Sequence, residues 1–273
     1  MKRNLFYLSF LLLLATFGCA QQGGNALEPT GEVAAAGEVA DDEIEALLED
    51  GFFDEEGGSD PVYYDPLEPV NRVFFAFNDK LYFWVLKPVN VAYSAVLPFD
   101  IRFAIGNFFS NMAAPVRIIN SLLQGKLENA GIVLSRFVIN STLGVYGLGD
   151  AAQRQFGLMP KQEDFGQTLG YWGLGEGMYI CWPIIGPSNV RDSLGFLGDA
   201  YTHPVVYFIN DFMFSSGYYI ESRVNLLSLN PEIYEDLKKY SLDPYISMRQ
   251  VYLDYRRQKI EDSDTLQRSD NEL

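Results

Sequence analysis

The chain is poor in the residue types from which most active sites and disulfide frameworks are built. It has one histidine, His203, and two cysteines, Cys19 and Cys181, among 273 residues. It contains no G-x-S-x-G nucleophile motif, and no set of His, Cys, Asp and Glu has the spacing of metal ligands. If Cys19 is modified, Cys181 has no partner and is expected to be a small buried apolar side chain. We therefore expect no enzyme, no cofactor and no bound metal.

A hydrolase is the weaker alternative, because Ser193, Asp199 and His203 lie close together in the sequence. A histidine directly before Pro204 is more typical of a helix start or a surface position. The glycine-rich stretch 170–177 does not indicate nucleotide binding, because it lacks the preceding strand and the lysine of a phosphate-binding loop.

Positive charge is missing from a long stretch near the N-terminus. Residues 20–71 contain no Lys or Arg, whereas fifteen Asp and Glu fall between Glu28 and Glu68, and the whole chain has a net charge of −16. The rest of the chain is close to neutral and has no basic stripe for phosphates, so a nucleic-acid partner is not expected. The composition rich in Gly, Ala and acidic residues predicts a flexible linker over residues 19–61.

The first residues have the pattern of an export signal. Lys2 and Arg3 precede an apolar stretch from Leu5 to Phe17, which is too short to span a membrane comfortably. Gly18-Cys19 follows, and the whole resembles a bacterial lipoprotein signal, so residues 1–18 are predicted to be removed and Cys19 to be lipidated. Ala20 after the cysteine favours the outer membrane over the inner one. An ordinary secretory leader is the alternative.

The body of the chain lacks any run of about 20 apolar residues, the length needed to span a bilayer as one helix. Short apolar segments are instead separated by Pro or Gly, and only 178–184 looks like a strand. This pattern predicts an all-α fold of short hydrophobic and amphipathic helices, with little strand, that lies at a membrane surface or enters it shallowly. Helices are expected within 65–87 after an opening turn, and near residues 89–96, 100–109, 116–123, 127–143, 191–201 and 205–227. Two further amphipathic segments are expected to start at Pro231 and at Pro244, the second of them running through Tyr255.

The first of these helices is apolar nearly all round. At about 100° per residue, one arc contains Val73, Phe77 and Trp84, while Tyr82 and Leu86 intrude into the opposite, polar side. A helix of this kind belongs either in a large core or in lipid.

Smaller signals predict where helices start, stop or bend. Asp100 is expected to cap the start of a helix, and Gly125 to end one in the left-handed conformation. Residues 215–217 (Ser-Ser-Gly) are expected to kink the long helix 205–227. Gly144, Gly147 and Gly149 predict a tight loop or hinge, because glycine adopts a positive φ without steric cost.

Six sequence blocks carry a family resemblance. They are DPLEPVNRVFFAFN at 65–78, NSLLQG at 120–125, RFVINSTLGVYGLGDAA at 136–152, EDFGQTLGYWGLGEGMY at 163–179, GPSNVRDSLG at 186–195 and DPYISMRQVY at 243–252. Together they resemble the MlaA (VacJ) family of outer-membrane lipoproteins. The resemblance divides the chain into a signal peptide (1–18), a lipid-anchored acidic linker (19–61), a helical ring domain (62–258) and a polar tail (259–273).

The resemblance implies a ring-like all-α body in the inner leaflet of the outer membrane, with an amphipathic channel through its centre. Members let phospholipids misplaced in the outer leaflet pass to a soluble periplasmic lipid carrier. The carrier takes them to an ATP-driven inner-membrane transporter, and in enterobacteria the ring sits against trimeric porins. No chemical step is known in the family. The alternative is a structural envelope lipoprotein that moves no lipid.

By position in the first block, Asn71, Arg72, Phe77 and Asn78 are candidates for contact with lipid in the channel. The alternative is that Asn71 and Asn78, seven residues apart, make structural hydrogen bonds between helices. The stretch 144–149 matches the family's hinge loop, which is thought to gate the channel.

Overall fold

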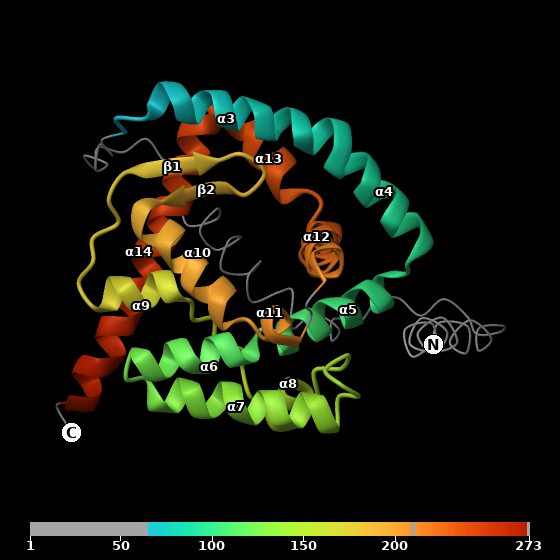
Figure 1. Ribbon diagram of the computed structural model, residues 1–273, viewed down its shortest axis with the longest axis vertical. Coiled ribbons are helices and arrows are strands. Elements are labelled where there is room, and N and C mark those ends of the chain that lie inside the picture. The colour runs from blue at the N-terminus through green and yellow to red at the C-terminus, as the bar shows by residue number, and fades with distance from the viewer. Residues whose placement is uncertain (1–64, 209–210, 272–273) are drawn as a thin grey trace. The chain divides into compact units, whose positions relative to one another are not determined.

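The computed structural model describes residues 65–208 and 211–271, all within the compact unit 35–273 (Figure 1). The predicted leader, Cys19 and the acidic linker lie outside the described residues. The elements are α3 (Glu68–Leu81), the π-helix η1 (Tyr82–Leu86), α4 (Lys87–Val96), α5 (Phe99–Met112), α6 (Ala114–Leu123), α7 (Leu127–Thr142), α8 (Ala151–Phe156), α9 (Phe165–Tyr171), β1 (Tyr179–Trp182), β2 (Gly186–Asn189), α10 (Val190–Thr202), α11 (Pro204–Phe208), α12 (Phe212–Leu229), α13 (Ile233–Tyr240) and α14 (Pro244–Asn271). The predicted all-α class with little strand is confirmed.

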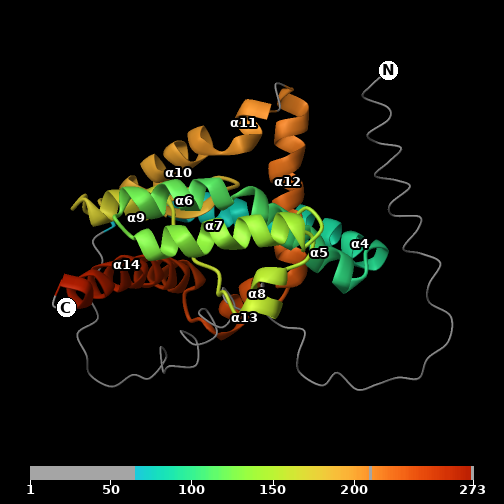
Figure 2. The same cartoon turned by 90° about the horizontal axis from the view of Figure 1, so that it is seen from below.

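The packed elements of the unit form a closed circuit. From β1 it passes through α3, η1 and α4 to α12, then through α5 and α6 to α9 and α10, and returns through β2 to β1 (Figure 1). Helix α7 packs on α6, and α14 packs on α9, β2 and α13. Figure 1 views α12 end on, whereas α6 and α7 lie across the same view, and Figure 2 shows α12 from the side.

The two strands form an antiparallel hairpin in which Tyr179 pairs with Asn189 and Trp182 with Gly186. The strand predicted at 178–184 is confirmed as β1, but β2 was not predicted. A small apolar cluster lies under this hairpin and contains Tyr179, Cys181, Tyr245 and Leu253. Cys181 is buried there, as expected for a small apolar side chain.

Side-chain caps start some of the helices. Asp150, Asp164 and Asn189 each accept a hydrogen bond from a backbone N–H in the first turn of α8, α9 and α10. Gly125 has a φ of 73°, which confirms the predicted left-handed end of α6. The prediction for Asp100 was wrong, because α5 begins at Phe99 after Pro98, and Asp100 lies in the first turn.

The helix predicted over 205–227 is in fact two helices, α11 and α12. The Asp211 side chain accepts hydrogen bonds from the N–H groups of Met213 and Phe214 and so starts α12 afresh. The break in the predicted helix thus lies before Phe212, and residues 215–217 lie within the continuous helix α12. Helix α14 runs on to Asn271, so the backbone of the predicted polar tail is helical as far as that residue.

The π-helix η1 shifts the direction of the buried side chains between α3 and α4. Asn71 and Tyr82 are buried on one side, and at about 100° per residue they differ in direction by only about 20°. In an uninterrupted α-helix Asn90 would lie about 80° from Tyr82, but a π turn takes up one extra residue, or about 100°, and reduces this to about 20°. The bulge thus keeps Asn71, Tyr82 and Asn90 on one buried side.

Candidate functional site

The described part of the chain is polar inside and apolar outside. Nine asparagines are buried in it, and most of them lie on helices: Asn71, Asn90, Asn107, Asn111, Asn120, Asn129, Asn140, Asn189 and Asn225. Large apolar side chains are exposed on most helices, among them Val73, Trp84, Val96, Leu127, Leu197, Phe208, Met213 and Ile220. An apolar exterior of this extent marks a surface that another molecule or a membrane covers.

The exposure of the first helix decides between the two environments that its sequence allowed. Val73 is 65% exposed and Trp84 is 74% exposed, whereas Asn71 is 1% exposed. The apolar arc of this helix therefore faces outward and does not form a protein core. A search of the described residues finds no helix with the length and hydropathy of a membrane span.

The buried asparagines join elements that are distant in sequence. Asn71 Nδ2 donates to the Tyr179 carbonyl at 3.0 Å, and Asn71 Oδ1 accepts from the Cys181 N–H at 2.9 Å. Asn78 Nδ2 donates to the Trp182 carbonyl, and Asn78 Oδ1 accepts from the Ile184 N–H. These two candidate residues therefore attach α3 to the β1–β2 hairpin. The sequence allowed such a structural role, although between helices and not to a hairpin.

The other two candidates on α3 have different surroundings. Arg72 forms ion pairs with Glu68 and Asp243, each at 2.8 Å, and its guanidinium lies 4.5 Å from the centre of the Tyr245 ring. Phe77 is 49% exposed and belongs to the apolar exterior. The four candidates thus do not converge on one point.

The loop between α7 and α8 is tightly folded. Val145, Tyr146 and Gly147 have consecutive positive φ values of 53°, 59° and 87°, a conformation that is strained for a β-branched residue such as Val145. The Gly147 and Gly149 N–H groups donate to the Asn140 and Gly144 carbonyls, both at 2.8 Å.

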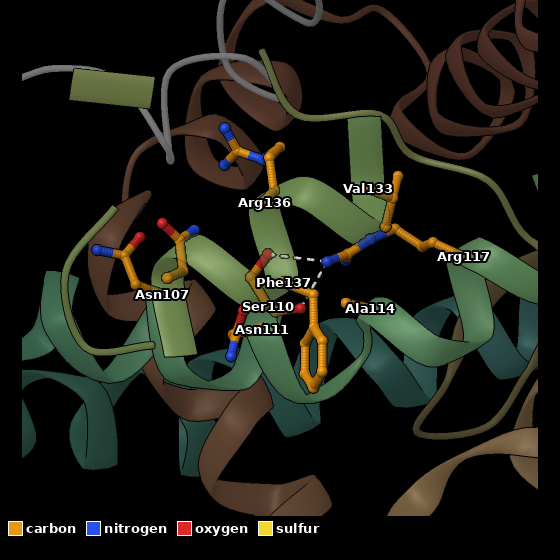
Figure 3. Close-up of a pocket in the computed structure, with 9 residues that line it drawn as sticks. Asn107, Ser110, Asn111, Ala114, Arg117, Val133, Arg136 and Phe137 are labelled. Carbon is orange, nitrogen blue, oxygen red and sulfur yellow. Dashed lines mark hydrogen bonds between the residues drawn. The ribbon is translucent and has the colours of Figure 1, made fainter. Parts of the chain in front are cut away.

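A small cavity lies between α5, α6 and α7, next to this loop (Figure 3). Its volume is about 20 Å³, and polar and basic side chains form much of its lining: Asn107, Ser110, Asn111, Arg117, Arg136 and Asn140. The sequence analysis did not identify this site. The signal was available, because Asn107 and Asn111 lie four residues apart in the largely apolar second half of α5 and so share one face.

The ion pairs around Arg256 form an extensive network among the described residues. Arg256 contacts both oxygens of Asp164, at 2.5 and 2.8 Å, and both oxygens of Asp192, at 2.9 and 3.0 Å. Burial alone would raise the pKa of both carboxyl groups, but the Arg256 guanidinium outweighs it and lowers each pKa below its usual range. The network joins α14 to the starts of α9 and α10.

Asp199 lies nearby and behaves in the opposite way. Its carboxylate accepts hydrogen bonds from Asn120 Nδ2 at 2.8 Å and from the Phe165 N–H at 3.0 Å. Burial and the negative charge of Asp164 raise the pKa of Asp199 to about 6. The folded protein therefore holds this proton more tightly than the unfolded chain, whose Asp has a pKa of about 3.9.

We expect Asp199→Asn to remove one part of the pH dependence of stability. Because the folded protein binds this proton more tightly, protonation of Asp199 stabilises the fold. This stabilisation is fully present below about pH 4 and is lost as the pH rises through about 6. Relative to the wild type, the variant should therefore gain stability between about pH 4 and pH 7, by on the order of 2 kcal/mol or less. Urea unfolding at several pH values measures this difference. A difference that stays constant from pH 4 to 7 would contradict the assignment.

The residues of the alternative hydrolase do not form a catalytic set. Ser193 Oγ accepts a hydrogen bond from Trp182 Nε1 at 2.9 Å and lies 3.1 Å from Ser188 Oγ. His203 Nδ1 accepts from the Val205 N–H. Among the hydrogen bonds of the described residues, none joins Ser193, Asp199 and His203. Over the same residues, no group of three or more His, Cys, Asp and Glu side chains has a metal-binding arrangement.

Comparison with known proteins places the chain in a family. Residues 63–259 match the sequence model of the family described as "MlaA lipoprotein". The chain is 33% identical to the "Intermembrane phospholipid transport system lipoprotein MlaA" of Escherichia coli (strain K12). This alignment of 195 residues covers 69% of this chain and 75% of that protein. It is 30% identical over 201 residues to the protein of the same description from Haemophilus influenzae, which covers 72% of this chain and 80% of the relative.

A solved structure is similar as well. It is described as "Structural basis for maintenance of bacterial outer membrane lipid asymmetry", and it matches with a TM-score of 0.64 and 32% sequence identity. The match covers 72% of this chain and 99% of that chain.

Proposed function

This chain belongs to the MlaA lipoprotein family, and we propose on that basis that it removes misplaced phospholipids from the outer leaflet of the bacterial outer membrane. The phospholipid would pass through an amphipathic channel in the helical body to a soluble periplasmic carrier, and from there to an ATP-driven transporter in the inner membrane. The result would be an asymmetric outer membrane. The proposal includes no chemical step on the lipid.

The inverted polarity of the body is the observation that carries this proposal. Exposed side chains such as Trp84 and Phe208 match acyl chains, while polar side chains such as Asn71 are buried. A body without a spanning helix among its described residues but with an apolar exterior fits a position in one leaflet. A phospholipid headgroup crossing that leaflet needs polar partners, because an unpaired polar group in hydrocarbon is costly.

We propose different roles for the four candidates on α3. Phe77 is on the apolar exterior, which suits contact with acyl chains. Arg72 and Asn78 are half-buried. We propose that each contacts a passing headgroup while it keeps the protein partners described above. Asn71 is satisfied by Tyr179 and Cys181, so its contribution would be to hold the hairpin against α3.

The proposed hinge is the loop containing Gly144, Gly147 and Gly149. Its three consecutive left-handed residues are the kind of backbone strain that accumulates at switch regions. Cys19 would anchor the mature chain through its acyl chains, and residues 19–61 would tether the body to that anchor. A trimeric porin is a further proposed partner.

A strain that lacks the gene tests the function directly. We expect phospholipid in the outer leaflet to rise when it is measured by surface labelling of intact cells, and to return to normal when the wild-type gene is restored. The control is the same strain carrying Cys19→Ala, in which an unanchored protein should fail to restore the normal level. An unchanged level in the deletion strain would contradict transport and favour the structural lipoprotein, which predicts leakiness without lipid accumulation.

A further inference from the structure

The cavity between α5, α6 and α7 contains a cation that lacks a carboxylate partner. Arg117 extends from α6 and donates to the Ser110 carbonyl and to Ser110 Oγ (Figure 3). It also donates, more distantly, to Gln162 Oε1 at 3.5 Å. Among the ion pairs of the described residues, none involves Arg117. An arginine without an acidic neighbour in a partly dehydrated site has strong affinity for an anion.

The side chains around Arg117 do not supply the missing negative charge. Arg136, on the opposite wall, is paired with Asp150 at 2.5 Å, and Asn140 also donates to that carboxylate at 3.0 Å. Tyr218 carries no charge at neutral pH, and burial raises its pKa further, to about 12. Burial and Arg117 lower the pKa of His203, and neither form of an imidazole supplies a negative charge. Burial and the positive charge of Arg136 lower the pKa of Arg117 itself to about 10. The cavity therefore keeps an excess positive charge at neutral pH.

We propose that this cavity binds the non-bridging oxygens of a phosphate group, with Arg117 as the principal contact. A guanidinium has five N–H donors in a planar fork that matches phosphate oxygens, and only three acceptors meet Arg117 in the described residues. The Ser110 hydroxyl at the same place can donate a further hydrogen bond. The assignment of the phosphate to a lipid headgroup rests on the proposed function.

The size of the cavity limits how the ligand enters. A volume of about 20 Å³ accommodates one or two oxygen atoms but not a whole headgroup. The phosphate would therefore insert its oxygens while the rest of the lipid stays outside. One wall also contacts the α7–α8 loop, because Asn107 Nδ2 donates to the Leu148 carbonyl, while Asn111 Nδ2 donates to Ser141 Oγ on the last turn of α7. The cavity is thus linked directly to the α7–α8 loop.

Thermal unfolding of the full mature chain in a neutral detergent tests the proposal with two probes. These are inorganic phosphate and monomeric dihexanoyl phosphatidylglycerol, with dihexanoylglycerol as the lipid without phosphate. A ligand that binds only the folded state raises the melting temperature. Both phosphate probes should raise it for the wild type, and dihexanoylglycerol should not.

Arg117→Gln should weaken binding of both probes about tenfold or more, because a charge-assisted contact is lost. Arg117→Lys should be intermediate, since it keeps the charge but not the fork. Arg154→Gln changes an exposed arginine on α8 and should bind like the wild type. Without phosphate, Arg117→Gln should melt at or above the wild-type temperature, because it removes an uncompensated charge; a purely structural arginine would show the opposite.

If a variant fails to fold, the wild type alone still tests the site. Phosphate should protect Arg117 from the arginine reagent phenylglyoxal, as mapped by mass spectrometry, and should not protect Arg154. Binding of both phosphate probes supports a headgroup site, and binding of inorganic phosphate alone supports the same site for the free anion. Absence of protection, or equal binding by the wild type and Arg117→Gln, would overturn the proposal. Neither result bears on the deletion strain, which tests transport separately.

Discussion

Replacing Gly144 with alanine is expected to destabilise the folded protein by about 3 kcal/mol or more, near the upper end of the cost of overpacking. A Cβ atom at this position would lie 2.1 Å from the Gly149 carbonyl oxygen and 2.5 Å from the Asn140 carbonyl oxygen. Both are backbone atoms, so no side-chain rotation can relieve the contact. The α7–α8 loop would have to open, with loss of the hydrogen bond from the Gly149 N–H to the Gly144 carbonyl.

Gly149→Ala is the matched control on the same loop. A Cβ atom there meets its nearest neighbour at 3.6 Å, which is an ordinary van der Waals contact. We expect this variant to unfold within about 1 kcal/mol of the wild type. Urea or thermal unfolding of the two purified variants in detergent compares them. Equal stability of Gly144→Ala and Gly149→Ala would contradict the packing of this loop.

The two variants also separate stability from the proposed hinge. If outer-leaflet phospholipid rises in cells carrying Gly149→Ala while the protein is as abundant and as stable as the wild type, the loop takes part in transport. If Gly149→Ala restores the deletion strain fully, the hinge proposal loses its support at that position. Gly144→Ala cannot test the hinge, because a destabilised protein would transport less phospholipid whether or not the loop moves.

Arg256→Gln is expected to cost about 3 kcal/mol, the lower end of the range for breaking a buried ion pair on one side, because the Asp164 side chain is 34% exposed. Arg256 is the shared partner of Asp164 and Asp192, and the Asp192 side chain is only 8% exposed. Without the guanidinium, Asp192 keeps Arg191, Asn189 and Tyr252 as partners, but Asp164 loses its ion pair. Hydrogen exchange should show the loss first in the amides of α9 and α14, which this network joins.

Arg257→Gln is the control for the neighbouring position on α14. Arg257 is half-exposed, and its contacts with Glu176 and Asp254 are both 3.9 Å long. Pairs of that kind contribute about 1 kcal/mol or less, so this variant should remain close to the wild type. Low pH gives a second check. Protonation of Asp164 and Asp192 should reduce the difference in free energy of unfolding between the wild type and Arg256→Gln. A stability difference that does not change with pH would count against the electrostatic explanation.

Buried polar contacts, and not a large apolar core, hold the described helices together. The apolar cluster under the hairpin is small, whereas hydrogen bonds join Asn225 to Tyr93 and Asn129 to Glu163. If the exterior lies in lipid, helix association gains little from burying apolar surface, because lipid tails are as apolar as leucine. Interhelical hydrogen bonds and close backbone contacts then become the main specific attractions. We expect the loss of polar contacts to be most costly at Arg256, and the loss of a close backbone contact to be most costly at Gly144.

The sequence alone determined the local structure well. Pro and Gly interrupt helices by local sterics, and apolar spacing marks the segments between them, so the helices near α4, α6, α7 and α10 were predicted within a few residues. The left-handed Gly125 followed from the steric freedom of glycine. The six blocks identified the family, which the comparisons then confirmed. These features depend on short-range sterics or on sequence pattern, and neither requires knowledge of the tertiary contacts.

Only the tertiary structure decided which side of each helix faces outward. Periodicity shows that Val73 and Trp84 share a face, but it cannot tell whether that face meets protein or lipid, because both environments favour the same residues. The π turn at Tyr82–Leu86 shifts the phase of the pattern, which a uniform 100° step cannot detect. The solitary charge of Arg117 is likewise invisible in sequence, since an ion pair depends on which carboxylate the fold brings within about 4 Å.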